Sequence, residues 1–266
     1  KNQNLTPIKT FYFTYKPNYQ NSNKNEKAII DRINILSNKI NEFVKKGGSI
    51  IVLSDRNVDS KNAAIPMILT VSAINQSLIS AGLRFKASIV VESGQISSPH
   101  HVACALGFGG AAIYSICSEI RSDEKFLDKE QKALFNFRKA CEKSLMKIMG
   151  KVGLCTVESY SGGEFFEPNF LNTKDPILKK YFPNIVSPVG GVGFSDIAKS
   201  IADWHKKSKT IYNHIKKKAN RFYLKSGQNS TGTIKYDKIG KITNVMNYNT
   251  LQQLARGSAL CDDCNG

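Results

Sequence analysis

The chain has 266 residues, 41% of them hydrophobic and 22% charged, a globular balance that excludes a wholly disordered or collagen-like polypeptide. No run of about 18 apolar residues is present, so we expect no membrane-spanning helix. Basic residues exceed acidic ones by 38 to 21, a formal charge of +17, but the excess is mostly lysine spread along the chain. The Arg-rich stripe and stacking aromatic motif of nucleic-acid modules are missing, so we do not expect a nucleic-acid partner.

The first half of the chain alternates predicted strands and helices. Apolar–polar alternation at 8–15 predicts an edge strand, and the β-branched runs at 49–56 and 87–94 predict buried parallel strands covered on both faces. Apolar residues recur at helical spacing over 27–46, and the Ala-, Ile- and Leu-rich segment 61–81 predicts a second helix.

The second half continues this alternation. We expect helices over 99–107, 128–150 and 195–206, and strands over 109–114 and 154–159. This order predicts an α/β fold with a mostly parallel sheet flanked by helices, either open and Rossmann-like or incomplete and barrel-like, with irregular terminal extensions. We expect three parts: an N-terminal strand and helix (1–48), the α/β core (49–205) and a basic C-terminal extension (206–266).

Polar side chains follow the predicted strands where each strand ends. These tips are residues 54–56, 92–94 and 158–160. Because the carboxyl ends of parallel strands meet at one edge of a sheet, the tips are expected to lie together where α/β proteins hold their sites. The pattern fits a functional edge and a set of loop ties equally well.

Three further motifs have simple structural explanations. His100 and His101 stand at a predicted helix start and point about 100° apart, so hydrogen bonding to neighbouring loops is favoured over a catalytic or metal role. The glycine-rich segments 107–110 and 190–193 match no phosphate-binding pattern and favour tight turns. The paired cysteines Cys261 and Cys264 form a weak metal or redox signal on their own. The other four, Cys104, Cys117, Cys141 and Cys155, are expected to be small buried side chains.

Several ordered segments resemble the central domain of the glutamate synthase large chain. The strongest is 140–153 (ACEKSLMKIMGKVG), and Val52–Arg56, Val90–Gly94, Thr156–Tyr160 and Gly190–Gly193 follow the family's order. The resemblance is dense over 49–205 and thin elsewhere, although 248–252 is similar to the family's exit segment. A lysine at position 1, with no signal-peptide core behind it, also leads us to expect a piece of a longer protein.

The resemblance implies a non-catalytic, intracellular connecting domain. It would join a glutamine amidotransferase domain to a synthase domain carrying FMN and a 3Fe–4S cluster, and help enclose the transfer of ammonia between them. The parent reaction converts glutamine and 2-oxoglutarate into two glutamates with electrons from NAD(P)H or ferredoxin, and a reductase subunit is a further candidate partner. We expect no cofactor, metal or catalytic residue within this chain and no membrane partner.

We expect the polar strand tips and the histidine pair to face the neighbouring domains along the ammonia path. These residues are Ser54, Asp55, Arg56, Glu92, Ser93, His100 and His101. Two alternatives stay open. One is an independent α/β enzyme with Glu92 and His101 as acid and base, and the other is a nucleic-acid-binding module built on the basic run 206–221.

Overall fold

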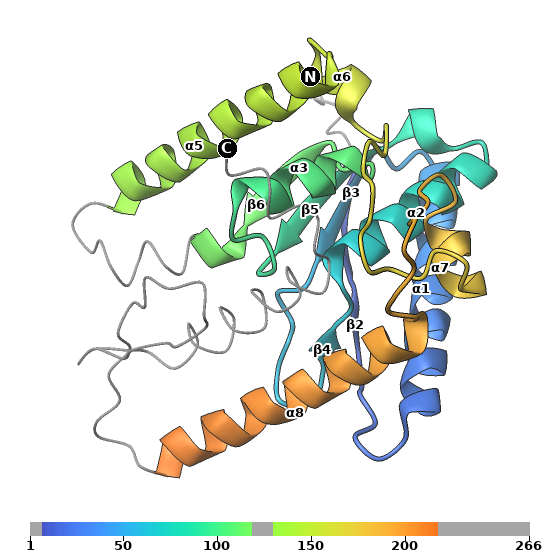
Figure 1. Ribbon diagram of the computed structural model, residues 1–266, viewed down its shortest axis with the longest axis vertical. Coiled ribbons are helices and arrows are strands. Elements are labelled where there is room, and N and C mark those ends of the chain that lie inside the picture. The colour runs from blue at the N-terminus through green and yellow to red at the C-terminus, as the bar shows by residue number, and fades with distance from the viewer. Residues whose placement is uncertain (1–6, 119–129, 218–266) are drawn as a thin grey trace, which may run out of the picture.

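Figure 1 shows the computed structural model, which describes residues 7–118 and 130–217. Its main sheet has four parallel strands: β1 (Ile8–Tyr12), β3 (Ile50–Ser54), β5 (Ser88–Ser93) and β6 (Ala112–Ser115). A second, antiparallel pair joins β2 (Thr14–Tyr15) to β4 (Ala63–Ala64). The predicted α/β class with a mostly parallel sheet is confirmed.

The strands of the main sheet lie side by side in the order in which they occur in the chain. One helix follows each of the first three strands: α1 (Ser22–Lys45), α2 (Met67–Ser80) and α3 (Pro99–Gly107). Every crossover therefore moves the chain one strand in the same direction. This is the order found in part of a β/α barrel, whereas a Rossmann sheet reverses direction at its centre. Of the two predicted architectures, the strand order matches the incomplete barrel.

One face of the sheet packs against α1 and α2 to form the hydrophobic core. Phe11, Leu53 and Val91 share a row of this face and are at most 5% exposed. They belong to one core cluster with apolar residues of α1 and α2, among them Ile33 and Leu78. Full burial of each such side chain stabilises the fold by about 1.5–3 kcal/mol.

The opposite face of the sheet, here called the open face, is only partly covered by described residues. Ile8 is 61% exposed, Tyr12 42% and Tyr114 44%. Val52 and Val90, which pair on this face, are half-buried and lie outside the core cluster. Within residues 7–118 and 130–217, the prediction that β3 and β5 are buried on both faces is therefore wrong.

Local chemistry sets the starts of α1 and α2. α1 begins five residues before the predicted start at 27, because the Asn21 side chain accepts a hydrogen bond from Lys24 N at 3.2 Å and caps it. α2 was predicted from 61 but begins at Met67, because Pro66 disfavours the helical conformation at residue 65. The two alanines before it form β4 instead.

After β6 the named elements of the described chain are helices: α5 (Glu130–Val152), α6 (Val157–Tyr160), α7 (Pro176–Tyr181) and α8 (Phe194–Lys217). The helices predicted over 128–150 and 195–206 are present, and α8 continues eleven residues past the predicted end. In Figure 1, α5 lies beside α3, and the N-terminal end of α8 meets α1 at a steep angle; both pairs of helices are in close contact. The short 3₁₀ helix η1 (Arg84–Lys86) precedes β5.

The predicted strand at 154–159 is wrong, since this segment contains the single helical turn α6. Thr156 caps the turn by accepting a hydrogen bond from Ser159 N at 3.3 Å. Tyr160 is fully buried beneath α3 and donates from its hydroxyl to Ala103 O at 3.2 Å. The segment therefore packs on a helix and adds no strand to the sheet.

Some predictions stay untested. The three-part division remains a prediction, although β1 and α1 share one sheet and one core with β3 and β5. Several predictions concern residues outside the described ranges: the exit segment 248–252, Cys261, Cys264 and the end of the basic run beyond 217. The glycine-rich segment 190–193 lies within the described ranges. Among the described helices, none combines the length and apolar character needed to cross a bilayer.

Candidate functional site at the carboxyl ends of the strands

The carboxyl ends of β3 and β5 meet as predicted. Ser54 pairs with Glu92 in the parallel register, and Asp55 N donates to Glu92 O at 3.3 Å. This register brings Ser54, Asp55 and Arg56 beside Glu92 and Ser93. The third predicted tip, 158–160, is part of α6 and does not extend the sheet.

Glu92 points to the open face and is held by two donors. Ser54 Oγ donates to Glu92 Oε2 at 2.5 Å, and Arg56 Nε donates to Glu92 Oε1 at 2.9 Å. The Arg56 guanidinium also lies 5.8 Å from the ring centroid of Tyr114. Because the Arg56 side chain is 48% exposed, solvent screens the ion pair, which contributes only about 0.2–1 kcal/mol. The pair therefore orients two surface groups more than it stabilises the fold.

Asp55 lies next to Glu92 in space but makes a separate, buried set of hydrogen bonds. Its Oδ2 accepts from Ser93 Oγ at 2.6 Å and from Gln95 Nε2 at 3.2 Å. Its Oδ1 accepts from Gly94 N at 2.9 Å. Asp55 is only 6% exposed, so these contacts fix the loop that leaves β5 against the end of β3.

The environment of Asp55 raises the pKa of its carboxyl group above the usual value. Burial raises the pKa of Asp55 most strongly, and the nearby Glu92 charge raises it further. The three hydrogen bonds from Ser93, Gly94 and Gln95 act in the opposite direction without cancelling the rise. The carboxyl group is thus a buried structural acceptor, enclosed by its own loop.

Gln95 completes this cluster and was missed by the sequence analysis. Its Nε2 donates to Ile65 O at 3.0 Å as well as to Asp55, and its Oε1 accepts from Met67 N at 2.9 Å. Pro66 provides no side-chain cap for α2, so Gln95 supplies one from a distant loop. The only sequence signal is its place one residue after the polar tip of β5.

The two histidines follow the same loop and act locally. His101 Nδ1 accepts from Ser97 N at 3.2 Å, and His100 Nε2 lies 3.4 Å from Cys104 Sγ. Burial, with a smaller effect of the His100 charge, lowers the pKa of His101 to about 4, and burial also lowers the pKa of His100. Both rings are therefore neutral at pH 7, as the predicted loop-bonding role requires.

Glu92 and His101, which the rival enzyme hypothesis pairs as acid and base, make hydrogen bonds to different partners. Glu92 bonds to Ser54 and Arg56, whereas His101 bonds to Ser97 across the following loop. Within the described residues, no three His, Cys, Asp or Glu side chains form a set able to hold a metal ion. The hydrogen bonds of the cluster hold the ends of β3 and β5 and the loop after β5 together, while Arg56 and Tyr114 lie at the surface.

Two other predicted features have clear outcomes. The segment 107–110 begins at the last residue of α3 and leads toward β6, the reverse of the strand-to-helix order of a phosphate loop. Gly109 adopts a φ of +114° next to the Asn75 side chain. Cys104, Cys117 and Cys141 are buried as expected. Cys155 is exposed, because its segment forms a connection between helices and no buried strand.

Comparison with known proteins places this geometry in a family. Residues 1–171 match the family described as "Glutamate synthase central domain". The chain is 34% identical over 170 residues to the glutamate synthase [NADPH] large chain of Bacillus subtilis, which covers 62% of this chain and 11% of that protein. It is 30% identical over 220 residues to the ferredoxin-dependent glutamate synthase of Cyanidium caldarium, covering 76% of this chain and 14% of that protein.

A chloroplastic relative gives the same result. The chain is 33% identical over 175 residues to the ferredoxin-dependent glutamate synthase 2 of Arabidopsis thaliana, covering 59% of this chain and 11% of the relative. The matched part thus spans only 11–14% of these three curated relatives. Since the family match covers well over half of the sequence, the chain belongs to the glutamate synthase central domain family.

Proposed function

We propose that this chain is the non-catalytic connecting domain of a glutamate synthase large chain. It would join a glutamine amidotransferase domain to a synthase domain that carries FMN and a 3Fe–4S cluster. The parent protein would convert glutamine and 2-oxoglutarate into two glutamates. Its electrons would come from NAD(P)H or ferredoxin; the relative in B. subtilis is named for NADPH and the one in C. caldarium for ferredoxin.

The observation that carries this proposal is the open face of the sheet. Parallel sheets are normally covered on both faces, yet here Ile8, Tyr12 and Tyr114 remain 61%, 42% and 44% exposed. Aromatic residues with an apolar body and a polar tip are enriched at protein interfaces. A face of this kind suits contact with a neighbouring domain of the same polypeptide.

The strand-end cluster supports the same role. Arg56 and Tyr114 would touch the neighbouring domain, while Ser54 and Glu92 orient Arg56 from behind. Asp55 and Ser93 would hold the loop that follows β5 in place, and the His100–His101 pair would fix its far end at the start of α3. Ammonia must pass between two active sites without being protonated by bulk water, so the enclosing wall has to be packed and rigid.

The test uses the full-length large chain that contains this domain. Tyr12→Asp places a charge on the open face, and Phe135→Asp places the same charge on an exposed aromatic of α5, which is 51% exposed. Glutamine hydrolysis, glutamate formation and free ammonia are measured in parallel. We expect Tyr12→Asp to release severalfold more free ammonia per glutamine hydrolysed, with Phe135→Asp close to the wild type. Full coupling in both variants would refute an interdomain role for the open face.

A further inference from the structure

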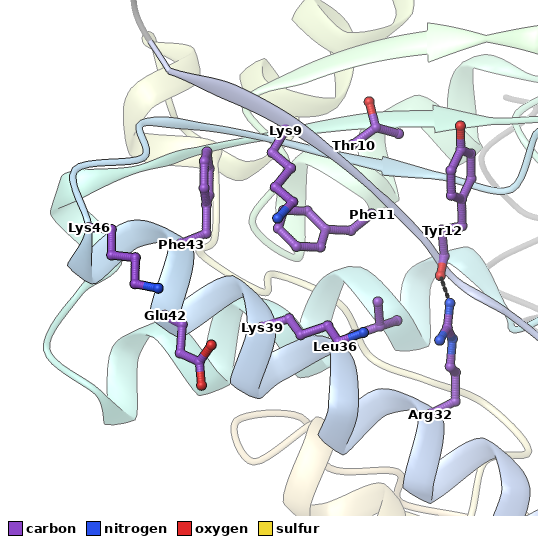
Figure 2. Close-up of a pocket in the computed structure, with 10 residues that line it drawn as sticks. All are labelled: Lys9, Thr10, Phe11, Tyr12, Arg32, Leu36, Lys39, Glu42, Phe43 and Lys46. Carbon is purple, nitrogen blue, oxygen red and sulfur yellow. Dashed lines mark hydrogen bonds between the residues drawn. The ribbon is translucent and has the colours of Figure 1, made fainter.

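A groove lies between the outer edge of β1 and α1. Its volume is about 420 Å³, within the usual range for a binding site. Figure 2 shows its lining side chains, with Lys9 and Phe11 descending from β1 toward the helix. The lining residues are Lys9, Thr10, Phe11, Tyr12, Arg32, Leu36, Lys39, Glu42, Phe43 and Lys46.

The groove carries a strong positive charge. Its lining includes four cationic side chains, Lys9, Arg32, Lys39 and Lys46, and a single carboxylate, Glu42. No ion pair among the described residues uses any of these four cations. Burial lowers the pKa of Arg32, and its Nε is buried without a hydrogen-bond partner among the described atoms. An anionic group in the groove would be attracted by all four.

Two aromatic rings of the groove lie next to the Lys9 ammonium. The rings of Phe11 and Phe43 pack edge to face with centroids 5.8 Å apart. Lys9 Nζ lies 5.5 Å from the centroid of Phe11 and 5.9 Å from that of Phe43. The two rings hold the Lys9 ammonium over the groove by cation–π attraction, so this charge is oriented before any ligand arrives.

The strand edge that borders the groove has open hydrogen-bonding groups. Ile50 N donates to Pro7 O at 3.1 Å, and Phe13 N donates to Ser54 O at 3.0 Å. Because the backbone direction alternates along a strand, the N–H and C=O groups of Ile8, Thr10 and Tyr12 point away from β3. The contact of Arg32 Nη2 with Tyr12 O, at 2.8 Å on this outer side, agrees with that direction. Among the described strands, none pairs with this edge.

We propose that the groove binds an acidic, extended peptide segment, which adds to the sheet as a further strand beside β1. The backbone of the segment would pair with the outward groups of Ile8 and Thr10, which is the mode called strand addition. Successive side chains of a strand point to opposite faces. Every second residue would therefore point toward α1, where carboxylates would meet Lys39 and Lys46. The intervening residues would lie on the open face beside Ile8 and Tyr12, where apolar side chains fit.

Exposed lysines on an edge strand can also serve to keep other strands away, and binding experiments separate the two roles. The 266-residue chain is titrated into two dye-labelled peptides at physiological salt, with fluorescence anisotropy as the readout. One peptide is (Glu-Val)4. The other, (Glu-Pro)4, has the same charge but cannot form a strand ladder, because proline lacks the N–H donor. We expect (Glu-Val)4 to bind about tenfold more tightly than its proline counterpart.

Charge-matched variants test where the peptide binds. The double variant Lys39→Ala/Lys46→Ala removes two exposed lysines of the groove, and Lys143→Ala/Lys147→Ala removes two exposed lysines of α5. Binding of (Glu-Val)4 should weaken about fivefold in the first variant and stay unchanged in the second. Circular dichroism checks that both variants fold.

Hydrogen exchange on the unaltered chain provides an independent measurement. Bound (Glu-Val)4 should slow exchange of the Thr10 amide, whereas (Glu-Pro)4 should leave it unchanged. The proposal fails if the two peptides bind equally, if the α5 variant weakens binding as much as the groove variant, or if Thr10 exchange does not respond.

Discussion

Replacing Gln95 with alanine should destabilise the domain by about 2–4 kcal/mol, because it leaves several buried partners without a hydrogen bond. The side chain accepts from Met67 N at 2.9 Å and donates to Ile65 O at 3.0 Å and to Asp55 Oδ2 at 3.2 Å. Ile65 is 0% and Met67 3% exposed, so water reaches their backbone groups poorly. A buried polar group that loses its partner costs about 1–3 kcal/mol, and partial hydration around the half-buried Gln95 keeps the total below a simple sum.

The measurement is urea unfolding at pH 7, followed by circular dichroism. Gln131→Ala is the control, since Gln131 is an exposed residue of α5 and its change should stay within about 0.5 kcal/mol. The denaturant slope should be the same in all three proteins, so that shifts of the midpoint report stability. If Gln95→Ala were no more costly than the control, Gln95 would not link β5 to the start of α2 energetically.

The remaining predictions concern three titratable or capping side chains. The pKa of Asp55 is higher in the folded chain than its value of about 3.9 in the unfolded chain, so protonated Asp55 stabilises the fold. This stability is fully present below about pH 3.9 and is lost as the pH rises through the folded pKa, so the stability of the wild type relative to Asp55→Asn should decline from about pH 4 upward. A difference in urea unfolding that does not change with pH would contradict this. Because the pKa of His101 is lowered to about 4, its NMR ring resonances should remain those of a neutral imidazole down to pH 5. The stability that comes from this lowered pKa should be lost as the pH falls from about 6.5 toward 4. Titration of the ring near pH 6.5 would contradict a buried environment. Asp175 accepts hydrogen bonds from Ile177 N at 2.9 Å, which caps α7, and from Phe194 N at 3.0 Å, at the start of α8. Asp175→Ala should therefore lower the free energy of unfolding by about 1–3 kcal/mol, measured by thermal or urea unfolding. Asp196→Ala, which removes one exposed contact, should lower it by less.

The sequence was sufficient where the determining interactions are local. β3 and β5 could be predicted from their β-branched runs, and α1 from the spacing of its apolar residues. The contact between Asp55 and Ser93 could be predicted because the carboxyl ends of parallel strands lie at one edge of a sheet. The segment 154–159 misled, because its apolar residues do not form a buried face. Leu154 packs against the cluster that contains Ala103 and Leu106 of α3, whereas Cys155 is exposed and Val157 is 41% exposed. The helical turn depends on one capping contact of Thr156.

Non-local features could not be predicted in this way. The partners of Gln95 lie 28 and 30 residues earlier in the chain, at Met67 and Ile65, and no spacing rule connects them. Whether other elements cover one face of a strand or both is also a non-local feature. The sequence of Ile50–Leu53 is the same in either case. The basic groove was also missed, because its cations come from β1, from α1 and from Lys46 just after α1, and only the folded chain brings them together.

The strand order of the main sheet also bears on how the chain is made. Each strand pairs with the one synthesised just before it, so β1 and β3 can associate while the rest of the protein is still on the ribosome. Such short-range pairings lower the entropic cost of closing each loop and favour rapid assembly. Packing of α8 on α1 is the long-range contact that must wait, and the N-terminal helix stays partly uncovered until residues beyond 194 have emerged.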